Sequence, residues 1–139
     1  MKRKVVVTGM GAITPVGNNV ETFWNSLKNG ACGIDFIKAF DTEKFKAKLA
    51  AEVKDFNPED TIGKKEAKRM DRYCQFAVAA AVEAVKDANL DLEKIEQERF
   101  GVVVGSGVGG IGTMEKQHQA LLEKGPSRVH PLFIPMIIG

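Results

Sequence analysis

Two short apolar runs, residues 5–7 and 100–104, are dominated by valine. Neither run alternates with polar residues, which is typical of a strand that is buried on both faces. A glycine-rich turn follows each run, beginning at Gly9 and at Gly105. The pattern predicts two buried strands, and a third short strand is expected within residues 49–53.

The spacing of apolar residues predicts three helices. The first covers residues 20–27, and Asn18 with Glu21 is expected to form its capping box. The longest is expected over residues 65–88, with a narrow apolar face composed mostly of alanine. Small side chains let another helix or a sheet approach closely, so this helix is expected to be buried within a larger layered fold. The third helix covers residues 113–124 and should end at the Gly-Pro pair that follows.

Charge is concentrated at one place in the chain. The whole sequence carries a net charge of +2, which does not by itself indicate nucleic-acid binding, and no nucleic-acid partner is expected. Residues 64–72 nevertheless contain five cations against two acids, where the macrodipole of the predicted helix favours anions. A solvated helix face is the ordinary interpretation of such a run. An acidic macromolecular partner is the functional alternative.

Composition excludes several other classes of protein. No apolar stretch approaches the length of a membrane span, and the N-terminus lacks the long apolar region of a secretory signal, so a cytoplasmic protein without a membrane partner is expected. Cys32 and Cys74 are too few for a disulfide framework. His118 and His130 have no partner at metal-ligand spacing, so no metal site is expected.

The second glycine turn has the G-x-G-x-x-G spacing of a dinucleotide fingerprint, across Gly105, Gly107 and Gly110. That site also needs a second parallel strand and an acidic residue about twenty positions further on. Residues 125–128 occupy that position and read Gly-Pro-Ser-Arg. A dinucleotide-binding oxidoreductase is therefore only a remote alternative, and no cofactor is expected. The turn instead offers a backbone without side chains, which another group can approach closely.

Several stretches resemble the β-ketoacyl-acyl-carrier-protein synthases, the condensing enzymes of fatty-acid synthesis, and within them the type II elongating subclass. They are residues 5–11, 14–18, 65–71, 105–110 and 125–135. The resemblance spans the chain in order. It implies an α/β fold of the layered thiolase-like type, with residues 1–139 as the N-terminal part of its first half. The uncapped apolar run at the end of the chain likewise suggests a truncation at Gly139.

The resemblance also implies a reaction. These homodimeric enzymes transfer an acyl chain from acyl carrier protein to a cysteine thiolate. Malonyl-carrier protein then loses carbon dioxide beside two histidines, and the resulting enolate attacks the acyl thioester. In the family, the cysteine and both histidines come after the position of Gly139. No catalytic residue is therefore expected in this chain, and residues 1–139 alone are expected to be inactive.

The resemblance assigns carrier-protein contacts to basic residues. Lys65, Lys68 and Arg69 match the patch that binds the acidic carrier protein. Arg128 matches one member of a second basic pair, but Ser127 stands where the other cation is expected.

Two further positions match the acyl pocket of the family. Val108 corresponds to a residue that lines this pocket, and Phe133 to one that closes it from across the dimer. A non-catalytic module that binds carrier protein or another partner through the basic patch is the alternative to an enzyme.

Overall fold

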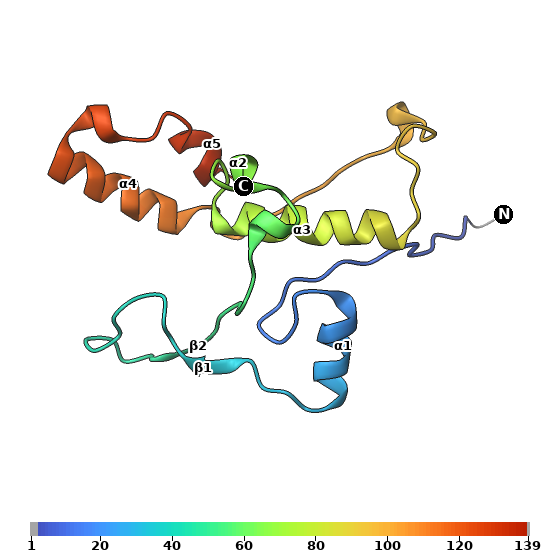
Figure 1. The fold of residues 1–139 in the computed structure, drawn as a ribbon, viewed down its shortest axis with the longest axis horizontal. Coiled ribbons are helices and arrows are strands. Elements are labelled where there is room, and N and C mark those ends of the chain that lie inside the picture. Colours follow the sequence, from blue (N-terminus) through green and yellow to red (C-terminus); the bar gives the residue numbers. More distant parts are fainter. Residues whose placement is uncertain (1–2, 139) are drawn as a thin grey trace. The chain divides into compact units, whose positions relative to one another are not determined.

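A computed structural model describes residues 3–138 (Figure 1). The described chain divides into two compact units. The first unit contains residues 3–57 and 80–90, and the second contains residues 58–79 and 91–138. The proposal that residues 1–139 belong to one larger domain stays a prediction.

In the first unit, helix α1 spans Val20–Lys28, as the apolar periodicity predicts. Its N-cap is Asn19, whose side chain accepts a hydrogen bond of 2.7 Å from the Thr22 amide. The expected capping box at Asn18 is wrong, because the Asn18 amide instead donates to the Lys54 carbonyl at 2.8 Å. The neighbouring asparagine therefore supplies the cap.

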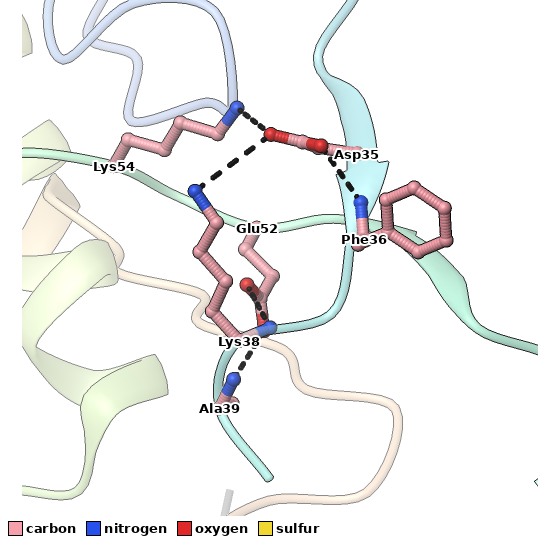
Figure 2. Close-up of polar contacts among 6 residues, drawn as sticks. All are labelled: Asp35, Phe36, Lys38, Ala39, Glu52 and Lys54. Carbon is pink, nitrogen blue, oxygen red and sulfur yellow. Dashed lines mark hydrogen bonds and ion pairs between the residues drawn. The ribbon is translucent and has the colours of Figure 1, made fainter. Parts of the chain in front are cut away.

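A small antiparallel hairpin follows α1. Strand β1 (Ile34–Phe36) pairs with β2 (Leu49–Ala51), with Ile34 opposite Ala51. This confirms the short strand expected within residues 49–53, whereas β1 has no clear signal in the sequence. Figure 2 shows the charged side chains around the hairpin, which come from both of its arms.

Carboxylates stabilise this hairpin from both arms. Asp35 accepts the Phe36 amide at 2.8 Å and lies 3.2 Å from the Lys54 ammonium (Figure 2). Glu52 accepts the backbone amides of Lys38 and Ala39 at 3.0 and 3.1 Å. The Phe36 hydrogen bond, followed by the Lys54 cation, lowers the pKa of Asp35 below its ordinary value.

The single long helix expected over residues 65–88 is wrong. The segment forms α2 (Lys64–Ala67) and α3 (Arg72–Asp87), with a break between them. Polar side chains stabilise the break: the Gln75 amide donates to the Ala67 carbonyl at 2.8 Å and to the Met70 carbonyl at 3.3 Å. Asp71 accepts the Tyr73 amide at 3.3 Å at the start of α3. An acidic residue thus occupies this helix N-terminus, as the macrodipole favours.

The alanine face of α3 carries the first glycine turn, within the first unit. A Cβ added to Gly9 would lie 2.3 Å from the Ala84 carbonyl oxygen, and one added to Gly11 would lie 1.8 Å from that of Ala80. This face is approached closely, but by a glycine turn rather than by the expected helix or sheet, and Ala79 is the one buried residue of α3. Two carboxylates of α3 also accept backbone amides of the turn, each at 2.9 Å: Asp87 from Met10, and Glu83 from Ala12.

The second unit ends in helices α4 (Ile111–Lys124) and α5 (Phe133–Ile137). Gly125 follows α4 with φ of 81°, a conformation that favours glycine, so the predicted stop is confirmed. The short 3-10 helix η3 (Pro126–Arg128) then reverses the chain, and α5 packs back against α4.

The two valine runs do not form strands in the described residues. The only sheet there is the β1–β2 hairpin, and the side chains of Val5 and Val103 are 94% and 98% exposed. A strand requires a neighbouring backbone to complete its ladder of hydrogen bonds, and neither run has one among residues 3–138. Trp24 on α1 is also mostly exposed, so an apolar stripe is present there without a covering partner.

Candidate functional site

The expected basic patch forms one wall of an open groove in the second unit. Its volume is about 710 Å³, and its lining residues are Lys64, Lys65, Lys68, Arg69, His130, Pro131 and Leu132. The cations come from α2 and the residues just after it, and the opposite side comes from the segment between η3 and α5. Folding therefore adds an imidazole and two apolar residues to the predicted patch.

The cations of this groove are available to a partner. Lys64, Lys65 and Lys68 are exposed, and none of them forms an ion pair within residues 3–138. Arg69 lies 3.3 Å from Glu66, but both side chains are about half exposed. A surface pair of this kind contributes little stability, so Arg69 can exchange this contact for one with a partner.

Asp71 holds the groove in place, because it joins the start of α3 to the start of α4. Its carboxylate accepts hydrogen bonds from both the amide and the hydroxyl of buried Thr113. A Cβ on Gly110 would lie only 2.9 Å from the same carboxylate, so the bare glycine backbone permits this contact. The Gly110 amide also donates to the Ile137 carbonyl at 3.0 Å, which fixes the end of α5 there.

Tyr73 adds a second attachment at the end of α5, where its hydroxyl donates to the Ile138 carbonyl. A hydrogen bond with the Cys74 side chain, together with burial, raises the pKa of Tyr73 to about 12. The shift extends the pH range over which the phenol keeps its proton and can donate to the Ile138 carbonyl. Cys74 is partly buried and Cys32 is exposed, as two free thiols.

Arg128 lies in a separate depression of about 610 Å³, also in the second unit. The other lining residues are Ala120 and Lys124, both on α4. Sequence reasoning does not single out Lys124, because a lysine in the last turn of a helix is ordinary. The available signal is its position four residues before Arg128, across a Gly-Pro turn.

The two acyl-pocket candidates lie in different surroundings. Phe133 lines an apolar cavity of about 430 Å³ together with residues of α4 that include Met114 and Leu121. Val108 is mostly exposed in the glycine turn and is not part of that cavity. The expectation that Phe133 reaches the acyl pocket from across a dimer stays a prediction.

The turn before α4 is open at its first two glycines. A Cβ on Gly105 or Gly107 would meet nothing within 4 Å. The Ser106 hydroxyl accepts the Gly109 amide at 2.8 Å, which closes the turn locally. After α4 the described chain continues into η3 and α5 rather than a strand, so the arrangement lacks the second strand that a dinucleotide site requires.

No group of three or more metal-ligating side chains gathers within residues 3–138. Over the same range, no helix combines the length and the apolar character needed to cross a membrane.

Comparison with known proteins identifies the family. Residues 2–139 match the N-terminal domain of β-ketoacyl synthase. The chain belongs to the β-ketoacyl synthase family. Its sequence is 53% identical over 136 residues to 3-oxoacyl-[acyl-carrier-protein] synthase 2 of Staphylococcus aureus (strain COL), and 46% identical over 138 residues to the synthase of the same name from Synechocystis. The alignments cover 98% and 99% of this chain but 33% of each relative.

Solved structures of ketosynthases share the fold. The chain matches the ishigamide ketosynthase/chain length factor with a TM-score of 0.77 at 33% identity, covering 96% of this chain and 33% of that one. A β-ketoacyl synthase from Burkholderia phymatum matches with a TM-score of 0.75 at 27% identity, with the same coverage of both chains. The expected α/β fold of the thiolase-like type is confirmed, and the chain spans about a third of the length of these relatives.

A third solved structure contains a carrier protein. It is a type II polyketide ketosynthase described as a complex with its acyl-carrier protein, and the chain matches it with a TM-score of 0.78 at 25% identity. The match covers 99% of this chain and 37% of that one.

Proposed function

We propose that residues 1–139 form the N-terminal part of a 3-oxoacyl-[acyl-carrier-protein] synthase that elongates fatty acids. The enzyme's reaction is the decarboxylative condensation of a malonyl-carrier protein with an enzyme-bound acyl chain. Loss of carbon dioxide leaves an enolate carbon, which attacks the acyl thioester and expels the cysteine thiolate. We expect no catalytic residue in this chain, because the family's cysteine and both histidines come after the position of Gly139. Cys32, Cys74, His118 and His130 match none of them.

The groove of Lys65, Lys68 and Arg69 is the observation that carries this proposal. It offers a cationic wall opposite His130, Pro131 and Leu132, and the cations suit the acidic surface of an acyl carrier protein. The relative that is 53% identical is named a 3-oxoacyl-[acyl-carrier-protein] synthase. That name supports acyl carrier protein as the partner of the groove. We further propose that the complete enzyme is a cytoplasmic homodimer, as its family resemblance implies.

A chimera tests the proposal directly. In it, residues 1–139 replace the matching third of the Staphylococcus aureus synthase, which is 53% identical over 136 residues. We expect this chimera to condense malonyl- and acyl-carrier protein. An inactive chimera that is nevertheless folded and dimeric would contradict the assignment of this segment.

Charge reversal in the chimera tests the carrier-protein contact. Replacing Lys65, Lys68 and Arg69 by Glu should raise the KM for acyl-carrier protein by about tenfold or more and leave kcat nearly unchanged, because these charges act on encounter.

The matched control reverses three exposed lysines of the hairpin loop, Lys44, Lys46 and Lys48, which removes the same charge from the first unit. Equal KM values in the two triple variants would refute a specific contact.

A binding module without catalysis is the second candidate, because the basic groove is complete within residues 64–132. In that case the 139-residue chain should bind carrier protein through the same three cations, while the chimera stays inactive.

A further inference from the structure

We propose that Asp71 is a positioning residue for acyl-chain selection, because its carboxylate joins the glycine turn that carries Val108 to the helix that carries Phe133. This inference rests on the proposed function, in which both residues belong to acyl pockets. It goes beyond that function, since Asp71 lines neither the basic groove nor the apolar cavity and is expected to touch no substrate.

Asp71 divides its two carboxylate oxygens between two helices. Oδ1 accepts the Tyr73 amide at 3.3 Å, at the start of α3. Oδ2 accepts both the amide of Thr113, at 3.3 Å, and its hydroxyl, at the start of α4. The first amides of a helix have no acceptor within the helix, and a carboxylate is favoured there. One side chain thus joins two helix N-termini that are 42 positions apart in the sequence.

The same carboxylate lies against the last part of the glycine turn. A Cβ on Gly110 would lie 2.9 Å from Oδ2 of Asp71 and 2.6 Å from the Met136 carbonyl oxygen of α5. Gly110 is therefore held between the carboxylate and the end of α5, with no room for a side chain. Its amide donates to the Ile137 carbonyl at 3.0 Å. The turn and the end of α5 thus meet beside Asp71.

Tyr73 closes this arrangement into a ring of contacts. Its amide donates to Asp71, and its hydroxyl donates to the Ile138 carbonyl at the end of α5. Gly110 and Thr113 are among the few buried residues of the described chain. A buried donor that loses its acceptor destabilises the arrangement, so the ring specifies one placement of the turn against α5.

The ring lies between the two acyl-pocket candidates. Val108 precedes Gly110 by two residues, and Phe133 begins α5, whose end the ring fixes. In the proposed homodimer, a pocket is lined by Val108 of one subunit and closed by Phe133 of the partner subunit. Each pocket therefore depends on Asp71 twice, once for its turn and once for the α5 that reaches it.

A long acyl chain should depend on this placement more than a short one does. A longer chain contacts more of the pocket wall, and a misplacement of about 1 Å can cost about a hundredfold in rate even when the altered residue is remote from the reacting atoms. Asp71 is thus expected to control which chain lengths the enzyme accepts.

The ratio of two substrates separates positioning from the other roles that Asp71 could have. A merely structural role lowers the amount of active enzyme equally for every substrate. A role in the neighbouring groove changes the KM for carrier protein whatever acyl chain it bears. Only a change in the pocket alters the ratio of kcat/KM between a long and a short acyl chain.

The experiment uses the chimera, malonyl-carrier protein, and either hexanoyl- or tetradecanoyl-carrier protein. Asp71→Ala should lower the ratio of kcat/KM, tetradecanoyl over hexanoyl, by about fivefold. Thr113→Val removes only the hydroxyl donor and should lower the same ratio by a smaller factor, whereas Thr113→Ser keeps the donor and should preserve it. The double variant of Asp71→Ala and Thr113→Val should match Asp71→Ala alone, because both remove one shared contact.

The matched control is Asp91→Ala, in the same unit. Asp91 is an exposed carboxylate that also accepts a backbone amide, that of Glu93 at 3.1 Å. Its removal should leave the ratio unchanged. If Asp71→Ala lowers kcat/KM for both chains by the same factor, its role is structural and the proposal is overturned. If Asp71→Ala does not fold, equal ratios in Thr113→Val and Thr113→Ser overturn it instead.

The outcomes also distinguish this inference from the proposed function. The triple charge reversal in the groove should raise the KM equally for both acyl chains. If it does so while the Asp71 and Thr113 variants keep the parent ratio, the positioning role is wrong and the proposed function stands. A folded, dimeric chimera that condenses neither acyl chain contradicts the proposed function, and the positioning role fails with it.

Discussion

The two segments in which valines lead into a glycine turn differ in what surrounds the glycines. In the first, Gly9 and Gly11 lie so close to the backbone of α3 that neither position has room for a Cβ. In the second, Gly105 and Gly107 have open space where a Cβ would be. The same sequence pattern thus serves a packing contact within the chain in one case and leaves a free backbone in the other.

This difference shows which glycines are required by a packing contact within the chain. The first turn is fixed by the alanine face and by the carboxylates of Glu83 and Asp87. The second turn is closed locally by the Ser106 hydroxyl and is joined to the rest of its unit at Gly110, whose amide donates to the Ile137 carbonyl. The open part beside Val108 is consistent with the proposed acyl pocket of the complete enzyme.

Adding one methyl group to a glycine of each turn should give the largest difference in stability between the two turns. In the chimera, Gly11→Ala should cost about 3 kcal/mol of stability, because the new Cβ meets the Ala80 carbonyl at 1.8 Å. Gly105→Ala should change stability by less than about 0.5 kcal/mol. Thermal denaturation measures both, and similar losses at the two positions would remove the distinction.

Removing a carboxylate from the first turn should have a smaller effect. Glu83 accepts the amides of Ala12 and Val20 at 2.9 and 2.8 Å, so Glu83→Ala leaves two donors without an acceptor and should cost about 2 kcal/mol. Asp87→Ala breaks one exposed hydrogen bond and should cost less. If Asp87→Ala proves the more damaging in thermal denaturation, Asp87 rather than Glu83 is the main polar anchor of the turn.

The smallest effect on stability is expected at the β1–β2 hairpin, where the exposed carboxylate of Asp35 makes its contacts in solvent. The pKa of Asp35 is lowered by the Phe36 amide and by Lys54. A lowered folded pKa means that the stabilisation is present above the unfolded value, near pH 4, and is lost as the pH falls through the folded value. An NMR titration of the Asp35 carboxyl should show this, and Asp35→Asn should remove the pH dependence of the hairpin signals.

Local patterns predicted the helices well. Apolar periodicity places α1 and α4, and the Gly-Pro pair after Lys124 marks where α4 ends. The break between α2 and α3 was missed because Gln75 and Asp71 stabilise it with polar contacts, which an apolar pattern does not contain. The valine runs failed as strands for a different reason: a strand depends on a distant partner, which a local sequence does not reveal.

Only part of the candidate site could be predicted from the sequence. The run around Lys65 is visible because five cations fall within nine residues of the sequence. Its opposite wall at His130, and the pairing of Lys124 with Arg128, depend on the reversal at Gly125. Residues brought together by a turn are not marked by any local excess of charge.

The break before α3 has a consequence for how this surface can change. The Gln75 side chain satisfies the carbonyls of Ala67 and Met70, so the backbone can break there without losing these hydrogen bonds. The cationic residues of α2 therefore lie on a separate short helix, outside α3. New side chains can be introduced at Lys64, Lys65 or Lys68 without altering the packing of α3. Substitutions at these three positions are therefore expected to change the proposed carrier-protein contact while leaving the scaffold of α3 intact.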